Sequence, residues 1–253
     1  MPSIDINCDV GESTATHQVG NDADLLPFIS SANIACGFHA GDPSVMDATV
    51  QLAIRYHIVI GAHPGYPDKE NFGRREILLP SEKIEEIVRV QIKALAEIVR
   101  KHKAELVHVK PHGALYNQAV KDVTIARAIA RAVKSLNPNL ILVGLAGSKL
   151  IEAGQELGLQ TASEGFPERA YEPDGSLRSR SLPGALISDV RKAVEQGLRL
   201  VAEGITTSLG GMPRRYPVDT LCIHGDSPGA LEITCALRQK LERAGYLIKG
   251  LRK

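Results

Sequence analysis

Short apolar runs alternate along the chain with longer segments in which apolar residues recur every three or four positions. The apolar runs predict seven β-strands, which span residues 4–8, 32–36, 58–62, 106–109, 140–145, 160–164 and 220–223. The segments between most of them have the period of amphipathic helices. Strands that alternate with helices predict a parallel sheet covered by helices on its outer surface.

The clearest of the predicted helices spans residues 81–102. Ser81 is placed to cap it, its first turn is acidic and its last turn is basic, which suits the helix dipole. The apolar stripe that faces the core comprises Ile84, Val88, Ile92, Leu95 and Val99.

No linker rich in Gly, Ser or Pro divides the chain, and it has no low-complexity segment or fixed-period repeat. We therefore expect residues 1–253 to form a single domain. The fold class that fits the number of strands is α/β, an irregular TIM-like β/α barrel with about seven parallel strands.

Composition and charge exclude several classes of protein. The formal net charge is +1, so nothing global indicates binding to nucleic acid or to a membrane surface. Aromatic residues make up only 4% of the chain, which argues against stacking platforms for bases or sugars. No apolar run is long enough for a membrane span, and the first residues lack the basic and apolar regions of a signal peptide. We expect a cytoplasmic, soluble protein with reduced cysteines.

The polar side chains that end the predicted strands are the candidates for chemistry, because a β/α barrel builds its site at the C-terminal ends of its strands. Asn7 and Asp9 lie two apart on the first strand and therefore point to the same side, and Glu12 follows them. These groups could serve as a base, as metal ligands or as a holder for a substrate amine. The alternative is that Asp9 or Glu12 caps the next helix.

Two further strand ends carry histidine. His39 lies in a glycine-bracketed turn before a helix that Asp42 can cap, and His63 directly follows the third strand. Both are candidate ligands or acid/base groups. Four other histidines lack such a setting, and we expect ordinary surface or core positions for them: His17, His57, His102 and His108.

Lys110 ends an otherwise apolar strand, where an ammonium group is costly to bury unless it meets an anion. We expect it, with His112 nearby, to face a carboxylate, a phosphate or a developing oxyanion. An internal ion pair of Lys110 with Asp9 or Glu164 is the competing interpretation.

His224 ends the last predicted strand, Asp226 follows it by two residues, and Glu164 ends the sixth strand. A histidine with two carboxylates from neighbouring strands is compatible with proton transfer and with binding of a divalent metal. Both interpretations stay open.

Three longer polar loops, residues 64–80, 165–183 and 206–217, carry several arginines. They are Arg74, Arg75, Arg169, Arg178, Arg180, Arg214 and Arg215. Solvation explains any one of them, but their grouping in three loops indicates an anionic ligand. The chain has neither a P-loop nor a Gly-x-Gly-x-x-Gly fingerprint, so a nucleotide would bind in another way or on a partner.

Taken in order, these motifs closely resemble the LamB/YcsF family of 5-oxoprolinase A subunits. The matching stretches are NCDVGE (7–12), SANIACGFHAGDP (31–43), GAHPGYPD (61–68), FGRR (72–75), VKPHGALYN (109–117) and HGD (224–226). The resemblance covers essentially the whole chain. The chain departs from the family at Phe166-Pro167-Glu168-Arg169, where the family has Phe-Ala-Asp-Arg. Glu168 retains the charge with one extra methylene, and Pro167 changes the local backbone.

The resemblance implies an enzyme that uses ATP to open the lactam of 5-oxo-L-proline to L-glutamate, together with separate B and C subunits. It also implies a barrel similar to the glycoside hydrolase/deacetylase superfamily, some of whose members hold a metal with one Asp and two His. On that pattern the ligands of a divalent metal would be Asp9, His39 and His63.

The residue roles follow from these placements. The catalytic candidates are Asp9, His39, His63, Lys110 and His112, and the candidates for binding substrate or phosphate are Asn7, Glu12, Arg74, Glu164, Arg169, His224 and Asp226. Two alternatives remain: a metal-dependent deacetylase or amidohydrolase, and a subunit that binds the substrate without catalysing its reaction.

Overall fold

Seven parallel strands close into a barrel in the computed structural model, which describes residues 1–13, 22–207, 214–227 and 229–252. In barrel order they are β1 (Ser3–Val10), β2 (Ser31–Ala35), β3 (Val59–His63), β4 (Leu106–Val109), β5 (Ile141–Leu145), β6 (Thr161–Gly165) and β9 (Thr220–His224). Strand β9 pairs with both β6 and β1, and this closes the ring. The irregular seven-stranded barrel predicted from the apolar runs is confirmed.

Three short strands lie outside this ring and were not predicted. Strand β10 (Leu247–Ile248) pairs in parallel with the start of β1. Strands β7 (Ile205–Thr207) and β8 (Arg214–Tyr216) form an antiparallel pair. The prediction of a plain polar loop over 206–217 is therefore wrong at both ends, because the two ends of that segment pair with each other; residues 208–213 lie outside the described ranges.

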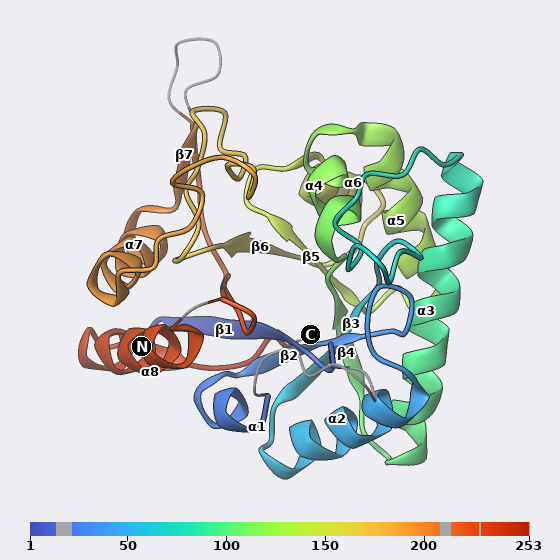
Figure 1. The fold of residues 1–253 in the computed structure, drawn as a ribbon, viewed down its shortest axis with the longest axis horizontal. Helices are drawn as coiled ribbons and strands as arrows, with labels where there is room; N and C mark the ends of the chain where they lie inside the picture. Colours follow the sequence, from blue (N-terminus) through green and yellow to red (C-terminus); the bar gives the residue numbers. More distant parts are fainter. Residues whose placement is uncertain (14–21, 208–213, 228, 253) are drawn as a thin grey trace.

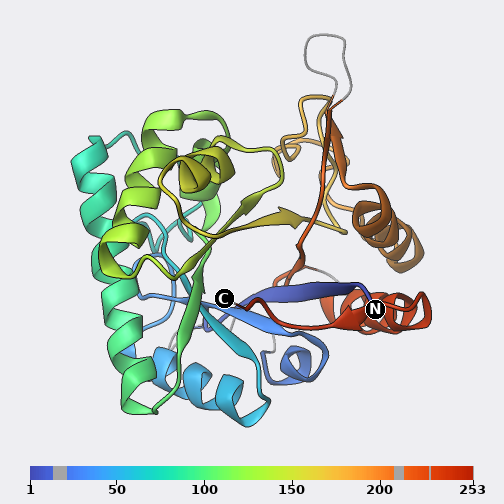
Figure 2. The ribbon, with the colours of Figure 1, turned by 180° about the vertical axis from the view of Figure 1, so that it is seen from behind.

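Helices surround the barrel. They are α1 (Asp22–Leu25), α2 (Pro43–Arg55), α3 (Ser81–Lys101), α4 (Gly113–Lys121), α5 (Val123–Leu136), α6 (Lys149–Glu156), α7 (Val190–Glu203) and α8 (Ala230–Arg243), with the 3₁₀ turn η1 (Leu26–Phe28) after α1. Helices α3 and α5 flank the barrel on one side, and α7 and α8 flank it on the opposite side (Figures 1 and 2). None of the helices in the described ranges is long and apolar enough to cross a membrane.

The helix predicted at 81–102 is present as α3, but Ser81 does not cap it. Pro80 occupies the N-cap position without a side-chain hydrogen bond, and its carbonyl oxygen accepts from the backbone N–H groups of Lys83 and Ile84. By contrast, Asp42 caps α2 as predicted, because its carboxylate accepts from the backbone N–H groups of the first turn.

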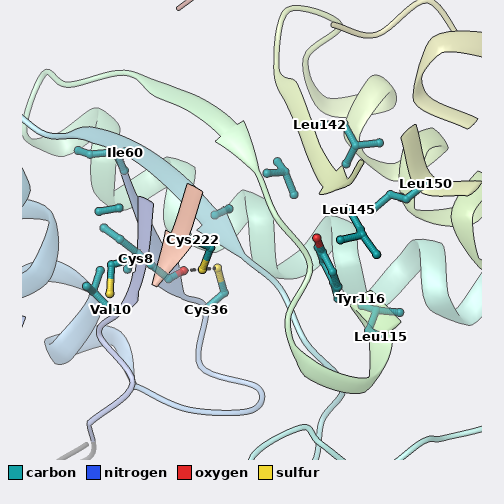
Figure 3. Packing of buried hydrophobic residues seen from close by; sticks show 14 of the residues in the cluster. Cys8, Val10, Cys36, Ile60, Leu115, Tyr116, Leu142, Leu145, Leu150 and Cys222 are labelled. Carbon is teal, nitrogen blue, oxygen red and sulfur yellow. Dashed lines mark hydrogen bonds between the residues drawn. The ribbon is translucent and has the colours of Figure 1, made fainter. Parts of the chain in front are cut away.

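Most of the apolar core lies between the strands and the helices, and a smaller apolar cluster comprises Ile141, Val143 and Ala162 of β5 and β6. Leu142 of β5 lies in this layer with Leu150 of α6, and Leu115 of α4 belongs to the same cluster (Figure 3). Along β1 the apolar residues alternate with three buried polar ones, Asp5, Asn7 and Asp9. Because successive side chains of a strand point to opposite faces, these three point into the barrel. The barrel interior is therefore polar along β1.

Candidate active site

A network of buried charged and amide side chains lies at the C-terminal ends of the strands. The ammonium group of Lys110, just after β4, lies 3.0 Å from Asp9 Oδ1 and 3.0 Å from Glu164 Oε1. Asn33 of β2 donates to Asp9 Oδ1 at 2.9 Å, and Asn7 donates to Glu164 Oε1 at 2.9 Å. The competing interpretation of Lys110 was an internal ion pair with Asp9 or Glu164. The structure contains both of these ion pairs.

The charges of this network stabilise one another. Burial alone would raise the pKa of Asp9, but the neighbouring His63 and Lys110 outweigh it and hold that pKa well below its usual range. Burial would lower the pKa of Lys110, yet the carboxylates of Asp9 and Glu164 hold it well above its usual range. The Asp9 carboxylate and the Lys110 ammonium therefore both stay charged near neutral pH.

Four buried side chains converge beside Asp9: Glu12, His39, His63 and His112, each offering one ligand atom within 4.8 Å of the others. Glu12 Oε1 lies 3.5 Å from His39 Nε2 and 3.4 Å from His112 Nδ1. The rings of His39 and His112 are stacked with their centroids 3.8 Å apart.

Hydrogen bonds to the backbone fix the proton positions on two of these rings. His63 Nδ1 lies 2.7 Å from the carbonyl oxygen of Lys110, and His112 Nε2 lies 2.8 Å from that of Phe72. Since a carbonyl oxygen only accepts, both of these ring nitrogens carry the hydrogen. The other two nitrogens, His63 Nε2 and His112 Nδ1, then face each other at 2.9 Å with lone pairs when both rings are neutral.

Opposed lone pairs call for a positive charge between them, supplied either by a proton or by a metal ion. Burial holds the pKa values of His39 and His112 well below their usual range, which favours neutral imidazole, the form that binds metals. Within the described part of the chain, Glu12 Oε1 and both ring nitrogens of His39 are buried without a hydrogen-bond partner. Three histidines and a carboxylate form a donor set that fits a divalent transition metal.

A second group of potential metal ligands comprises Asp9, Cys222 and His224. It differs from the first group because an ammonium group contacts two of its members. Lys110 Nζ lies 2.9 Å from Cys222 Sγ and 3.0 Å from Asp9 Oδ1. Burial raises the pKa of the Cys222 thiol well above its usual range, so the sulfur is protonated rather than a thiolate ligand. The ammonium group already supplies the positive charge here.

A cavity of about 560 Å³ opens onto these groups. Of the residues predicted from sequence, it is lined by Asp9, His63, Arg74, Lys110, His112, Arg169 and His224, whereas Asn7, Glu12, His39, Glu164 and Asp226 are not part of its lining. Arg178 and Arg180 line it as well. Of the three arginine-bearing loops, the described residues of 206–217 contribute nothing to this lining.

The arginines play two different structural roles. Asp226 Oδ2 accepts from the guanidinium group of Arg74 and lies 3.7 Å from Arg180 NH1, so one carboxylate lies between two cations at the cavity. Arg169 is buried and donates to the carbonyl oxygens of Arg178 and Ala185. Its guanidinium group therefore holds the loop that carries Arg178 and Arg180.

Several residues of the site were not predicted. Asn33 bridges Asn7, Asp9 and His108, and Tyr116 donates to Glu164 Oε2 at 2.8 Å. Glu168 Oε1 accepts from His224 Nδ1 and, at 3.2 Å, from the backbone N–H of the same residue. The available signal for Asn33 was its position two residues after Ser31 in a strand that is otherwise apolar. His17 lies outside the described ranges.

Residues 225–229 read Gly-Asp-Ser-Pro-Gly, which matches the Gly-x-Ser-x-Gly spacing of a serine nucleophile after a strand. Such a serine sits on a strained turn next to a histidine base. Ser227 has no positive φ, unlike His57, Phe72 and Lys103, and its buried hydroxyl has no hydrogen-bond partner among the described residues. The geometry of a serine hydrolase is therefore lacking.

Comparisons with known proteins agree along the full length of the chain. The model of the LamB/YcsF family matches residues 4–253. A curated relative from Chloroflexus aggregans, whose name is that of the 5-oxoprolinase A subunit, is 51% identical over 98% of this chain and 99% of its own. The crystal structure of a lactam utilization protein from Thermus thermophilus has a TM-score of 0.90 at 44% identity and covers 98% of this chain and 100% of that one.

The barrel is also similar to that of a peptidoglycan N-acetylglucosamine deacetylase catalytic domain from Eubacterium rectale. The TM-score is 0.53 at 10% identity, covering 99% of this chain and 88% of that one. At this identity the similarity concerns the fold alone. It agrees with the expectation of a deacetylase-like barrel.

Proposed function

Because the chain belongs to the LamB/YcsF family, we propose that it is a 5-oxoprolinase subunit that opens the lactam ring of 5-oxo-L-proline to give L-glutamate. The observation that carries this proposal is the identity of about half of all residues, over the full length, with a relative that bears the name of the 5-oxoprolinase A subunit. The similarity to a lactam utilization protein supports the same substrate class.

The cavity has the charges that this substrate requires. Arg74 and Arg180 share the single carboxylate of Asp226, which leaves an excess of positive charge at the cavity. A guanidinium group binds a carboxylate with parallel hydrogen bonds. The two arginines therefore suit the carboxylate of 5-oxoproline.

Asp9 is the group that can activate water. It lines the cavity, and its Oδ2 lies 3.3 Å from Nε2 of the candidate ligand His63. As the oxygen of a water molecule bonds to the lactam carbonyl carbon, the Asp9 carboxylate can take the proton that the water releases. Lys110 contributes by holding Asp9 in its ionised form and in place, since its ammonium group is already paired with Asp9 and Glu164.

A divalent metal is the cofactor that the cluster fits best. We place its ligands at Glu12, His39, His63 and His112. Among the described residues, Glu12 Oε1 and both ring nitrogens of His39 are buried without a hydrogen-bond partner, and the rings of His63 and His112 face each other with lone pairs. A bound metal of this kind supplies Lewis acidity and lowers the pKa of coordinated water. The ligands expected from the sequence were Asp9, His39 and His63. The set proposed here adds Glu12 and His112, and Asp9 becomes a neighbour of the metal site rather than a ligand.

Metal analysis tests this ligand set. Protein purified without chelator is expected to hold about one divalent metal ion per chain. Glu12→Gln and His112→Ala should lose the ion, whereas Asp9→Asn should retain it. The surface variant His102→Ala, whose ring pairs with Asp47, is the matched control and should retain it too. Wild-type protein that takes up no zinc, manganese or cobalt, with no change in its melting temperature, would contradict the assignment and indicate a shared proton instead.

ATP is best assigned to partner subunits. An unstrained lactam is a poor electrophile, and phosphorylation of its carbonyl oxygen would activate it. The chain lacks a P-loop, and we propose that B and C subunits supply or share the nucleotide site.

Glutamate formation from 5-oxoproline tests the proposed function. With ATP and magnesium, the chain together with its B and C subunits should release glutamate, and the chain alone should release little or none. Absence of glutamate in both mixtures, with all subunits folded, would exclude the proposal.

A metal-dependent amidohydrolase or deacetylase is the second candidate, and the cluster of Glu12 and three histidines is the observation that favours it. This alternative predicts that the metal-loaded chain hydrolyses acetylated amines by itself, without ATP. If the chain alone releases acetate and the His39→Ala variant does not, the deacetylase function is favoured over the 5-oxoprolinase function.

A further inference from the structure

Glu168 and His224 form a carboxylate–histidine pair at the cavity wall. Glu168 lies on the segment after β6, and His224 is the last residue of β9. The side chain of Glu168 is only 2% exposed, and its Oε1 accepts from His224 Nδ1 and from the backbone N–H of His224. One carboxylate oxygen therefore fixes both the ring and the backbone of the same residue.

This contact determines which ring nitrogen is available for chemistry. A carboxylate acceptor at Nδ1 keeps a hydrogen on that nitrogen, so Nε2 is the position that takes up and releases a proton. The side chain of His224 is 16% exposed and lines the cavity, and no described residue forms a hydrogen bond with its Nε2. The imidazole therefore presents a proton-exchanging nitrogen to the space where a ligand would bind.

The ring is held from a second direction as well. Phe166 stacks on His224 with ring centroids 5.3 Å apart and an angle of 16° between the planes. The backbone of His224 lies beside that of Asp9, because the two residues are paired between β9 and β1. Packing and hydrogen bonding thus hold His224 at the same strand ends that carry Asp9 and Lys110.

We propose that His224 is the general acid for ring opening and that Glu168 is the positioning residue that orients it. This inference rests on the proposed function. As the bond between the lactam carbonyl carbon and the ring nitrogen breaks, the electron pair of that bond stays on nitrogen. The Nε2–H proton of His224 passes to this nitrogen, so an amine leaves rather than an amide anion. The proton released by the attacking water goes to the Asp9 carboxylate, and His224 regains a proton from solvent.

The pair offers a kinetic test. In the complete complex, Glu168→Gln is expected to lower kcat roughly 100-fold with KM nearly unchanged, since general acid catalysis contributes about 10²- to 10⁴-fold. Glu168→Asp should recover most of the activity. His224→Asn should be at least as impaired, and adding Glu168→Gln to it should cause no further loss, because Glu168 acts only through His224. Glu152→Gln, an exposed carboxylate paired with Lys149, is the matched control and should leave turnover unchanged.

A spectroscopic test does not depend on activity. The Nδ1–H proton of His224 should give a strongly downfield-shifted resonance in the proton NMR spectrum of the chain, absent in both Glu168→Gln and His224→Asn while the remaining spectrum stays folded. A resonance that persists in Glu168→Gln, or wild-type kcat in that variant, would overturn the assignment. Failure of the wild-type complex to make glutamate would refute the proposed function, while the resonance would still decide whether the pair exists.

Discussion

At the level of single residues, the barrel interior is polar along β1, where such interiors usually hold branched apolar side chains. Asp5 is fully buried and accepts hydrogen bonds from the hydroxyl groups of Ser30, Ser31 and Thr220. Three hydroxyl donors do not replace the hydration of a carboxylate, and burial raises the pKa of Asp5 from 3.8 to about 6.

This shift predicts how stability depends on pH. Between 3.8 and about 6 the folded chain keeps a proton on Asp5 that the unfolded chain has released, so the carboxyl group costs stability as the pH rises through that window. The cost is fully present above the folded value and amounts to about 3 kcal/mol. Asp5→Asn removes the ionisation, so its free energy of unfolding relative to wild type should increase by about 2 kcal/mol from pH 4 to pH 7, since part of the cost is already present at pH 4. Urea denaturation measures it, and a difference that does not vary with pH would contradict the assignment.

At the scale of elements, β3 and β4 meet at a position that only glycine can occupy. A Cβ atom on Gly61 would lie 2.0 Å from His108 Nε2, and His108 is fully buried against it. The register between the two strands shifts at this point, between Ile60 and Gly61. Close packing of an imidazole over the glycine thus joins the two strands.

Gly61→Ala should therefore destabilise the chain by about 1–3 kcal/mol through overpacking. In a His108→Ala background the same substitution should cost much less, because the overlapping ring is gone. A double-mutant cycle of unfolding free energies measures the coupling. Additive effects of the two substitutions would show that the ring and the glycine do not share this space.

The sequence predicted the elements well where a local signal was present. Apolar runs marked all seven barrel strands, and Asp42 marked the start of α2. It did not reveal β10 or the β7–β8 pair, because two- and three-residue strands have no recognisable periodicity. It also could not show that polar side chains of different strands bond to one another inside the barrel, since this depends on the register between strands.

At the scale of the whole molecule, parallel strands bring residues together that lie far apart in the sequence. From placement at strand ends, we expect Asp9, His39, His63, Lys110, His112, His224 and Asp226 to share one cleft, and all of them except His39 and Asp226 line the cavity. It was harder to predict from the sequence that Glu12 groups with the histidines. Glu12 follows Gly11, whose φ is +70°, and the backbone turn at this glycine has no counterpart in a pattern of apolar and polar residues.

In the proposed function, the lactam is opened in the cavity of this chain rather than on a partner. Turnover of the complete complex containing Asp9→Asn tests it most directly, because Asp9 lines the cavity and pairs with both Lys110 and His63. Glutamate formation from 5-oxoproline is expected to fall roughly 100-fold or more, while the variant still assembles with its partners. Wild-type turnover in that assembled complex would contradict it and would leave the chain as a subunit that only binds the substrate.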